Sequence, residues 1–410
     1  MIFRRFLHQN ARWLGAGALL TLSSSFGQTF FISLFAGEIR AEFGLSHGAW
    51  GGIYTLGTLA SAAVMLWAGG LTDRYRVRHL AVWVLFAFSI VSLAMAAVPW
   101  VWLLPLVIFG LRFCGQGMLS HITIVALGRW FARNRGRANA VISSGYLLGE
   151  ALLPVAVVLL MGLIGWRLSW AVAAGVTLLF VPALLVLLRS ERKPGSTIAE
   201  DDNAGMHGRH WTRKEAMSHW LFWVLAVGLL APPVFGTAFF FQQVYMTEIK
   251  GWELKNFVAL MPLYTASGFI SMFASGWIVD RWGSARLLPV AMLPSAVGFV
   301  LIALGDSLLF AAAGLVSLGL MQGAMVAIAG SLWPEYYGTR HLGSVRAVAT
   351  SLMVFGSALG PGITGVLIDF GVDYRLQLIG MAAYYVAVSI MLAFAFARAR
   401  LLLPSSEGIA

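Results

Sequence analysis

Charged residues are scarce in this chain: Asp, Glu, Lys and Arg together make up 11% of its 410 residues, whereas hydrophobic residues make up 59%. Soluble globular domains carry about 25% charged and about 45–50% apolar residues, so the composition excludes a soluble globular protein. Cysteine is almost absent as well. The single Cys114 lies inside an apolar run, and one cysteine cannot build a disulfide, metal or haem framework. We expect neither a metal nor a cofactor.

Long apolar runs dominate the sequence instead. A helix that spans a bilayer needs about 20 apolar residues, so a chain this hydrophobic has room for about twelve such helices. We predict membrane helices near residues 13–37, 49–71, 79–98, 101–127, 139–163, 168–188, 220–243, 257–279, 286–305, 308–332, 346–368 and 376–397. The first run is too long for the apolar region of a signal peptide, which has about 7–15 residues. The predicted fold class is an all-α integral membrane protein with twelve transmembrane helices.

A polar stretch divides these runs into two groups of six. It carries a Pro-Gly-Ser turn, an acidic cluster and several basic residues, and it lacks the pattern of a segment that forms a core. We therefore predict an N-terminal six-helix bundle at residues 1–188, a cytoplasmic linker at 189–219 and a C-terminal six-helix bundle at 220–410.

The distribution of Lys and Arg predicts the orientation. Most of the 28 basic residues fall in the N-terminal segment, the linker, the C-terminal segment and the loops on the same side of the membrane. Because cytoplasmic loops are enriched in Lys and Arg, we expect both termini to be cytoplasmic. The formal net charge of +11 does not indicate a nucleic-acid partner, since the basic residues lie in short breaks between apolar runs.

Sequence motifs recur at an offset of 207 residues. The stretch G-G-L-T-D-R, Gly69–Arg74, closes the second run, and G-W-I-V-D-R, Gly276–Arg281, closes the eighth. Gly149 and Gly356 are related by the same offset. The two halves are therefore predicted to be parallel repeats, an arrangement in which a transporter's site lies between two bundles that rock around it.

These motifs resemble those of a known family. The stretch G-G-L-T-D-R-Y-R-V-R, Gly69–Arg78, resembles the loop motif G-x-L-x-D-R-x-G-R-K of the major facilitator superfamily, and Gly276–Gly283 resembles its second copy. Arg76 stands where the family usually has Gly. With the number of runs and the repeat, the resemblance covers essentially the whole chain, and it implies the major facilitator fold and transport by alternating access.

The resemblance also implies a cytoplasmic gate, formed when the carrier faces outward and broken when it faces inward. Asp73 can face the positive end of a neighbouring helix, and the basic residues offer partners at the membrane surface. Alternatively, Arg76 and Arg78 are simple positive-inside anchors. The predicted gate residues are Gly69, Asp73, Arg74, Arg78, Gly276, Asp280 and Arg281.

Two ionisable side chains, Arg112 and Glu150, lie well inside predicted helices, about eleven residues or roughly 16 Å from the nearer end. Either charge alone in the bilayer would cost at least about 2.5 kcal/mol, so each should face a partner or a cavity. We hypothesise that Glu150 takes up and releases a proton, while Arg112 keeps it ionised or binds an anionic substrate. The segment R-F-C-G-Q-G also resembles the family's fourth-helix Arg motif, which is associated with proton coupling. A static ion pair between the two residues is the alternative.

Polar amides mark further candidate residues. At 100° per residue, Gln116 and Thr123 lie on the same helix face as Arg112. An amide inside a bilayer must find a partner, so substrate contact and helix–helix hydrogen bonding are both possible roles. The remaining candidates for the pathway are Gln28, Gln242 and Gln322. Pro232-Pro233 should break the seventh helix, because proline removes a backbone donor.

The section around the fifth predicted helix resembles one branch of the superfamily. The pattern G-x-x-x-G-E-x-x-x-P, Gly145–Pro154, and the preceding G-R-W-F-A-R-N-R-G-R-A resemble the monocarboxylate and oxalate/formate carriers. Those carriers commonly hold the substrate carboxylate with a basic residue in the eighth or eleventh helix. Here the eighth run has none and the eleventh has only Arg346 at its end, so an anion would be held chiefly by Arg112.

The sequence therefore predicts a secondary active transporter of a small organic solute, a monocarboxylate-like anion, with proton coupling. Proton-driven efflux of an amphipathic compound and a non-transporting sensor with the same fold are the alternatives. An enzyme is not expected, because Glu150 is the only carboxylate at membrane depth and the eight histidines are scattered. We expect a monomeric, multi-pass protein of a bacterial inner membrane.

Overall fold

The computed structural model describes residues 2–131, 135–190 and 204–403, and every regular element in these ranges is helical. The first half contains α1 (Ile2–Ser24), η1 (Ser25–Gly27), α2 (Thr29–Ile32), η2 (Ser33–Phe35), α3 (Ala36–Phe43), α4 (His47–Ala68), α5 (Leu71–Arg74), α6 (Val77–Ala97), η3 (Val101–Leu103), α7 (Leu104–Leu111), η4 (Arg112–Leu119), α8 (Ser120–Trp130) and α9 (Arg135–Leu187). The second half contains η5 (Met206–Gly208), α10 (Arg213–Ser218), α11 (Trp220–Ala231), η6 (Pro232–Gly236), α12 (Thr237–Phe241), α13 (Gln243–Lys250), α14 (Leu254–Val258), α15 (Met261–Trp282), α16 (Ser284–Leu304), α17 (Leu308–Tyr337), α18 (Leu342–Asp369), α19 (Tyr374–Ala399) and η7 (Arg400–Leu402).

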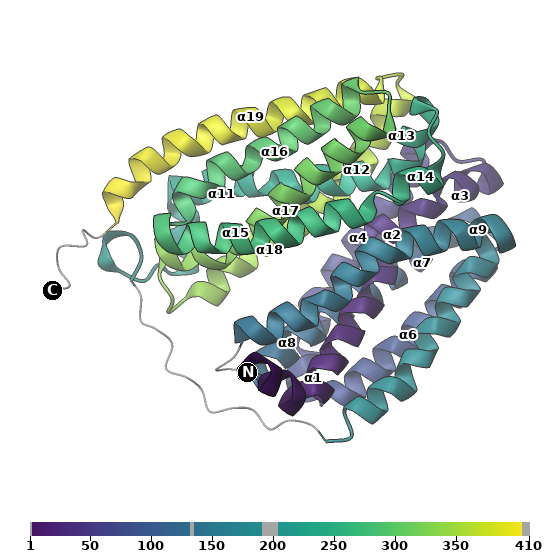
Figure 1. The fold of residues 1–410 in the computed structure, drawn as a ribbon, viewed down its shortest axis with the longest axis horizontal. Coiled ribbons are helices and arrows are strands. Elements are labelled where there is room, and N and C mark those ends of the chain that lie inside the picture. The colour runs from purple at the N-terminus through teal and green to yellow at the C-terminus, as the bar shows by residue number, and fades with distance from the viewer. Residues whose placement is uncertain (1, 132–134, 191–203, 404–410) are drawn as a thin grey trace.

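Ten helices of the described chain are long and apolar enough to cross a membrane, or eleven if the bent pair Arg5–Gly27 and Thr29–Phe43 counts as one span. The longest helix, α9, is interrupted at Gly165, where φ is 77° and ψ is 169°. Only glycine adopts such a conformation without strain, and the chain reverses direction there (Figure 1). The predicted runs 139–163 and 168–188 are the two arms of α9.

The predicted repeat is confirmed by the bounds of the helices. Helix α6, Val77–Ala97, recurs as α16, Ser284–Leu304, with both ends displaced by 207 residues. The longer span Val101–Trp130 recurs in the same way as Leu308–Tyr337. The two halves therefore place equivalent helices at equivalent positions in the sequence.

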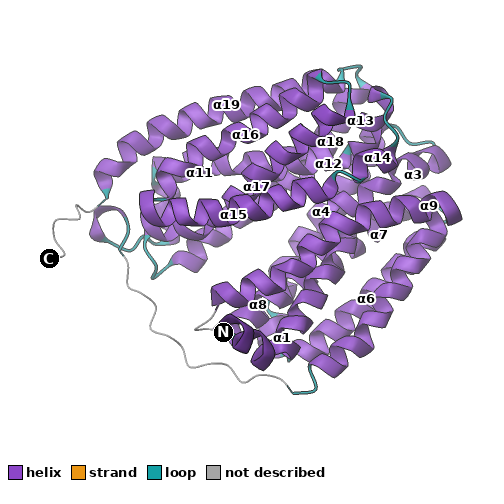
Figure 2. Ribbon diagram, viewed as in Figure 1, coloured by secondary structure: helices purple, strands orange, loops and turns teal. Residues whose placement is uncertain are grey.

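The helices form two groups (Figures 1 and 2). Helices α1 to α9 make the N-terminal bundle and α11 to α19 the C-terminal bundle. The bundles approach each other at the end that carries α3, α13 and α14, here called the far end, and diverge toward the terminal end, which carries the start of α1 and the end of α19 (Figure 1).

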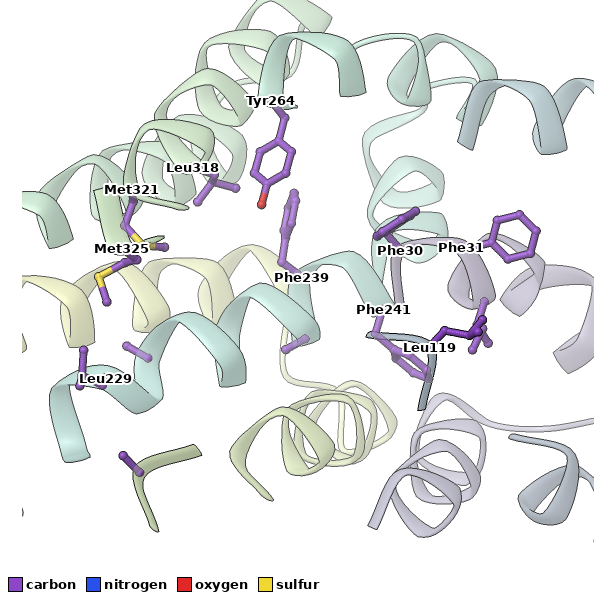
Figure 3. Packing of buried hydrophobic residues seen from close by; sticks show 14 of the residues in the cluster. Phe30, Phe31, Leu119, Leu229, Phe239, Phe241, Tyr264, Leu318, Met321 and Met325 are labelled. Carbon is purple, nitrogen blue, oxygen red and sulfur yellow. The ribbon is translucent and has the colours of Figure 1, made fainter. Parts of the chain in front are cut away.

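Packing inside each bundle relies on small residues and aromatic rings. A Cβ on Gly145 of α9 would collide with Ala18 of α1, and one on Gly149 would collide with Ser25 of η1, as expected for close helix packing in membranes. In the C-terminal bundle, Phe239 and Tyr264 belong to the buried hydrophobic cluster (Figure 3), and the Phe240 ring stands edge-on to the Tyr264 ring of α15 with the centroids 5.2 Å apart. These contacts fix the helices that carry the site described below.

Part of the predicted linker is folded. Residues 191–203 lie outside the described residues, but the following segment packs on the terminal end of the C-terminal bundle. The Trp211 side chain is 4% exposed, and its backbone N–H donates to the Tyr337 carbonyl at 3.0 Å. A capping box between Thr212 and Glu215 starts α10. The prediction of an unpacked linker rested on the polar composition of the whole segment. Two apolar residues in it, Met206 and Trp211, are buried and hold this part of the linker in place.

Candidate functional site

A cavity of about 330 Å³ lies between the two bundles. Helices α1, α8 and α9 line it from the N-terminal bundle, and α15 and α17 line it from the C-terminal bundle. Ligand pockets in proteins have a similar character, with mostly apolar walls and a few polar groups. Glu150 is the only charged residue among the described residues that line this pocket.

Glu150 projects into the pocket from the first arm of α9 and is 8% exposed. The Tyr146 hydroxyl, one helical turn earlier, donates a hydrogen bond to Glu150 Oε1 at 3.2 Å. Asn139, Ser143, Tyr146 and Glu150 all line the pocket, and their spacing of three or four residues places them on one helix face. Sequence reasoning singled out only Glu150, although this spacing would have revealed the other three.

The opposite wall combines aromatic, thioether and amide side chains. Tyr264, Phe269 and Met272 of α15 line the pocket, together with Gln322 of α17. Gln322 was a predicted pathway residue, and the structure places it and Glu150 in one pocket. Tyr264 was missed by the sequence reasoning, because a tyrosine in an apolar run does not stand out from core aromatics.

Arg112 does not line the pocket; it lies among the neighbouring helices and is 1% exposed. Its Nη1 donates to the Gly27 carbonyl at 3.2 Å and to Thr29 Oγ1 at 3.3 Å. The guanidinium also lies 5.3 Å from the centre of the Tyr54 ring, within the range of a cation–π contact. No ion pair joins Arg112 to Glu150 in the described chain.

The backbone conformation explains why Arg112, Gln116 and Thr123, which were predicted to share one helix face, do not all line the pocket. Residues Arg112–Leu119 form a π-helical segment, whose turns hold more residues than an α-turn. The phase of 100° per residue is lost there, so Thr123 faces the pocket while Arg112 and Gln116 do not. The count of 100° per residue therefore does not relate Thr123 to Arg112 and Gln116 across this segment.

The other predicted amides lie at breaks in the first and seventh predicted helices. Gln28 separates η1 from α2 with extended φ and ψ of −85° and 158°. Gln242 separates α12 from α13, and its Nε2 donates to Thr364 Oγ1 at 3.3 Å. Neither lines the pocket. At Pro232-Pro233, where a break was predicted, the helix continues through a π-helical segment, Pro232–Gly236, inside the single span Trp220–Phe241.

The predicted gate residues lie at the terminal end of their bundles. Asp73 forms an ion pair with Arg129 at 2.9 Å, and Arg129 also donates to the Thr72 carbonyl at 2.7 Å. In the second copy of the motif, the Arg281 guanidinium lies over the rings of Trp277 and Trp282. The other predicted gate residues are Gly69, Arg74, Arg78, Gly276 and Asp280, of which Arg74 and Asp280 are exposed. The Asp73 partner therefore lies in its own bundle.

Hydrogen bonds join the two bundles at the far end. The Asp369 carboxylate of α18 accepts from Ser46 Oγ at 2.6 Å, from the His47 N–H at 3.0 Å and from the Gly48 N–H at 2.7 Å, all at the start of α4. Farther along α4, Thr55 Oγ1 donates to the Ala358 carbonyl of α18 at 2.7 Å. We call this contact between α4 and α18 the far-end seam. The sequence reasoning missed it.

Comparison with known proteins identifies the family. The model of the Major Facilitator Superfamily matches residues 17–361 and 262–408. The chain belongs to the Major Facilitator Superfamily. The resemblance inferred from the loop motifs is thus confirmed, and the protein is a multi-pass membrane transporter of a small molecule, not an enzyme.

Relatives within the superfamily include carriers of organic acids by name. The gallate transporter of Pseudomonas putida is 25% identical over 401 residues, covering 87% of this chain and 86% of its own length. Monocarboxylate transporter 13 of Bos taurus is 26% identical over 284 residues, covering 67% of this chain and 63% of its own.

A solved structure shares the superfamily fold. The crystal structure of a bacterial homolog to the human lysosomal transporter Spinster, in an inward-facing and unoccupied conformation, superimposes with a TM-score of 0.73 at 15% identity. The match covers 97% of this chain and 99% of that one. At this identity the likeness concerns the fold alone.

Proposed function

We propose that this superfamily member is a proton-coupled secondary transporter of a small amphipathic organic acid, and that Glu150 carries the proton. The observation that supports the proposal is the pocket between the bundles, in which Glu150 is the only charged residue among the described lining residues. A titratable carboxylate at membrane depth is the usual sign of a proton pathway.

The architecture that we propose has twelve spans. The bent pair at the N-terminus is the first span, and the two arms of α9 on either side of Gly165 are the fifth and sixth. Residues 1–188 and 220–410 then form the two moving bundles, with cytoplasmic termini. In that orientation the structure faces inward, because the far end is joined and the bundles diverge toward the terminal end (Figure 1).

Proton coupling follows from the charge of the pocket. An ionised Glu150 repels a carboxylate substrate, whereas a protonated Glu150 can donate a hydrogen bond to it. Asn139, Gln322 and Tyr264 offer further neutral donors, and Phe269 gives an apolar wall for the body of the substrate. Substrate and proton therefore bind together, which is the requirement for symport.

Arg112 has an indirect role in this proposal. Its hydrogen bonds to Gly27 and Thr29 hold the break in the first span, and it does not line the pocket in this conformation. The substrate carboxylate is therefore held by neutral donors and the proton on Glu150. This differs from the hypothesis drawn from the sequence, in which Arg112 itself binds the anion.

The charge of the pocket also favours one other function, the efflux of an amphipathic cation. A protonated amine would bind only to an ionised Glu150, so that proton and substrate would compete for the site and exchange across the membrane. The two functions predict opposite effects of pH on substrate binding.

Transport into proteoliposomes tests the proposal. Labelled lactate, pyruvate and gallate should enter faster when the outside is acidic, and Glu150→Gln, which mimics the protonated side chain, should remove that stimulation. Glu248→Gln is the matched control, because Glu248 is an exposed carboxylate of α13 outside the pocket. If none of these acids is transported and a proton gradient drives ethidium across the membrane in exchange for protons instead, the efflux function is correct and the symport proposal is wrong.

A further inference from the structure

Tyr146 connects the proton site to the helix break of the first span. Its hydroxyl donates to Glu150 Oε1 at 3.2 Å, and its ring stands edge-on to the Phe30 ring of α2, with the centroids 6.1 Å apart at 83°. Tyr146 is thus held at both ends, by the carboxylate and by a ring that belongs to another helix.

Phe30 is in turn held by the opposite bundle. The Gln243 side chain of α13 is fully buried, and its Nε2 donates to the Phe30 carbonyl at 3.0 Å and to Ser33 Oγ at 2.8 Å. Ser33 Oγ donates onward to the Phe240 carbonyl at 2.7 Å. These bonds form only while the bundles are in contact here, so the position of Phe30 reports whether the far end is closed.

Few other titratable groups surround Glu150. Tyr264 of α15 lines the same pocket, and Arg112 of η4 donates to Gly27 and Thr29 and forms no ion pair with the carboxylate. The residues of α1 and α17 that line the pocket carry hydroxyl, amide or apolar side chains. Tyr146 is therefore the one polar group of the described chain that holds the carboxylate by a hydrogen bond.

We propose that Tyr146 is a positioning residue that ties the proton on Glu150 to closure of the far end, through Phe30 and Gln243. This inference rests on the proposed function. A donor stabilises the ionised form of a carboxylate, so Tyr146, held in place while the far end is closed, favours release of the proton toward the terminal end. When the far end opens, the Gln243 bonds break, Phe30 no longer supports the tyrosine ring, and Glu150 regains a proton from the far side.

Infrared titration of the protein in lipid nanodiscs tests the first step without a known substrate, because the probe is the proton itself. The protonated-carboxyl band that disappears in Glu150→Gln belongs to Glu150. In Tyr146→Phe, which keeps the ring against Phe30, the midpoint of that band should move to higher pH by about one unit. Tyr384→Phe is the control, since the Tyr384 hydroxyl donates only to the Val227 carbonyl, and its midpoint should match the wild type.

A variant that removes hydrogen bonds between the bundles, with a control inside one bundle, tests the connection to the far end. Gln243→Met removes the donors to Phe30 and Ser33, and it should shift the Glu150 midpoint in the same direction as Tyr146→Phe. Ser389→Ala is the control, because it removes the buried bond to the Pro289 carbonyl inside the C-terminal bundle and no bond between the bundles, and it should leave the midpoint unchanged.

The outcomes separate the two proposals. If Glu150→Gln removes no band and leaves the pH dependence of transport intact, the proposed function itself is wrong. If Glu150 titrates as expected but Tyr146→Phe leaves its midpoint in place, only the positioning role is overturned. Equal shifts in Gln243→Met and Ser389→Ala would show that the bonds between the bundles are not what moves the midpoint, and would overturn the connection to far-end closure.

Discussion

Lys250 illustrates how a single buried cation stabilises this fold. Its side chain is fully buried at the end of α13, and its Nζ donates to the carbonyls of Ala303 and Gly305 at 2.8 and 2.9 Å. These carbonyls end α16 and have no donor within the helix. Lys250→Met should therefore cost about 1–3 kcal/mol of stability, which a lower thermal unfolding midpoint in detergent would reveal.

A neighbouring lysine provides the control for this measurement. Lys255 pairs with Glu253 at 3.1 Å, but the two side chains are 56% and 62% exposed, and such surface pairs contribute about 0–1 kcal/mol. Lys255→Met should leave the midpoint close to that of the wild type. An equal loss in both variants would show that the helix-end contact is not what stabilises α16.

The corresponding carbonyls of the first repeat are capped by a different residue. Arg167 donates to Ala96 and Val98 at 2.9 and 2.8 Å, and these positions precede Ala303 and Gly305 by 207 residues. In the sequence, Arg167 and Lys250 lie between predicted membrane helices or at the end of one, where nothing assigns them a partner. Their capping roles depend on where α6 and α16 end in space, which neither charge counting nor the motif reveals.

At the scale of helices, glycine allows α4 and α18 to approach each other closely at the far-end seam. A Cβ on Gly51 of α4 would lie 2.5 Å from the Pro361 carbonyl oxygen of α18. One position later on the same helix, a Cβ on Gly52 would meet nothing within 4 Å. The two positions therefore form a matched pair, one inside the seam and one outside it.

Gly51→Leu should consequently push the bundles apart at the far end, whereas Gly52→Leu should not. Spin labels on cysteines introduced at the exposed residues Ala41 and Phe370 would report the distance between the bundles. We expect Gly51→Leu to add a population with a longer distance, while Gly52→Leu retains the wild-type distribution. Identical distributions in the two variants would mean that the glycine contact does not control closure.

Hydropathy and the repeat predicted the positions of the long helices well, because each span must bury its backbone polar groups in its own helix. The breaks were harder to predict. In the π-helical segment from Arg112 to Leu119, each turn holds more residues than an α-turn. The direction of the side chains that follow it therefore cannot be calculated from 100° per residue. The pocket residue Glu150 was predicted because a carboxylate in an apolar run is rare, whereas Tyr146 and Tyr264 resemble ordinary core residues in the sequence.

In the whole molecule, the two bundles are in contact at the far end and separate at the terminal end. The direction of transport depends on which side of the membrane each end faces. The distribution of the basic residues in the sequence predicts that the terminal end is cytoplasmic. Lys214 of α10 is exposed at the terminal end, and Asn256 of α14 is exposed at the far end. Cys114, the only native cysteine, is buried, so cysteines introduced at these two positions can be labelled selectively.

A membrane-impermeant maleimide should label Lys214→Cys in inside-out vesicles and Asn256→Cys in right-side-out cells. Ser143→Cys, inside the pocket, should react from the same side as Lys214→Cys, because the pocket lies between bundles that are joined at the far end. If Ser143→Cys reacts from the side of Asn256→Cys, the resting protein faces outward in the membrane. If instead Lys214→Cys and Asn256→Cys exchange sides, the basic residues do not set the orientation, and the proton that Glu150 releases toward the terminal end leaves the cell rather than entering it.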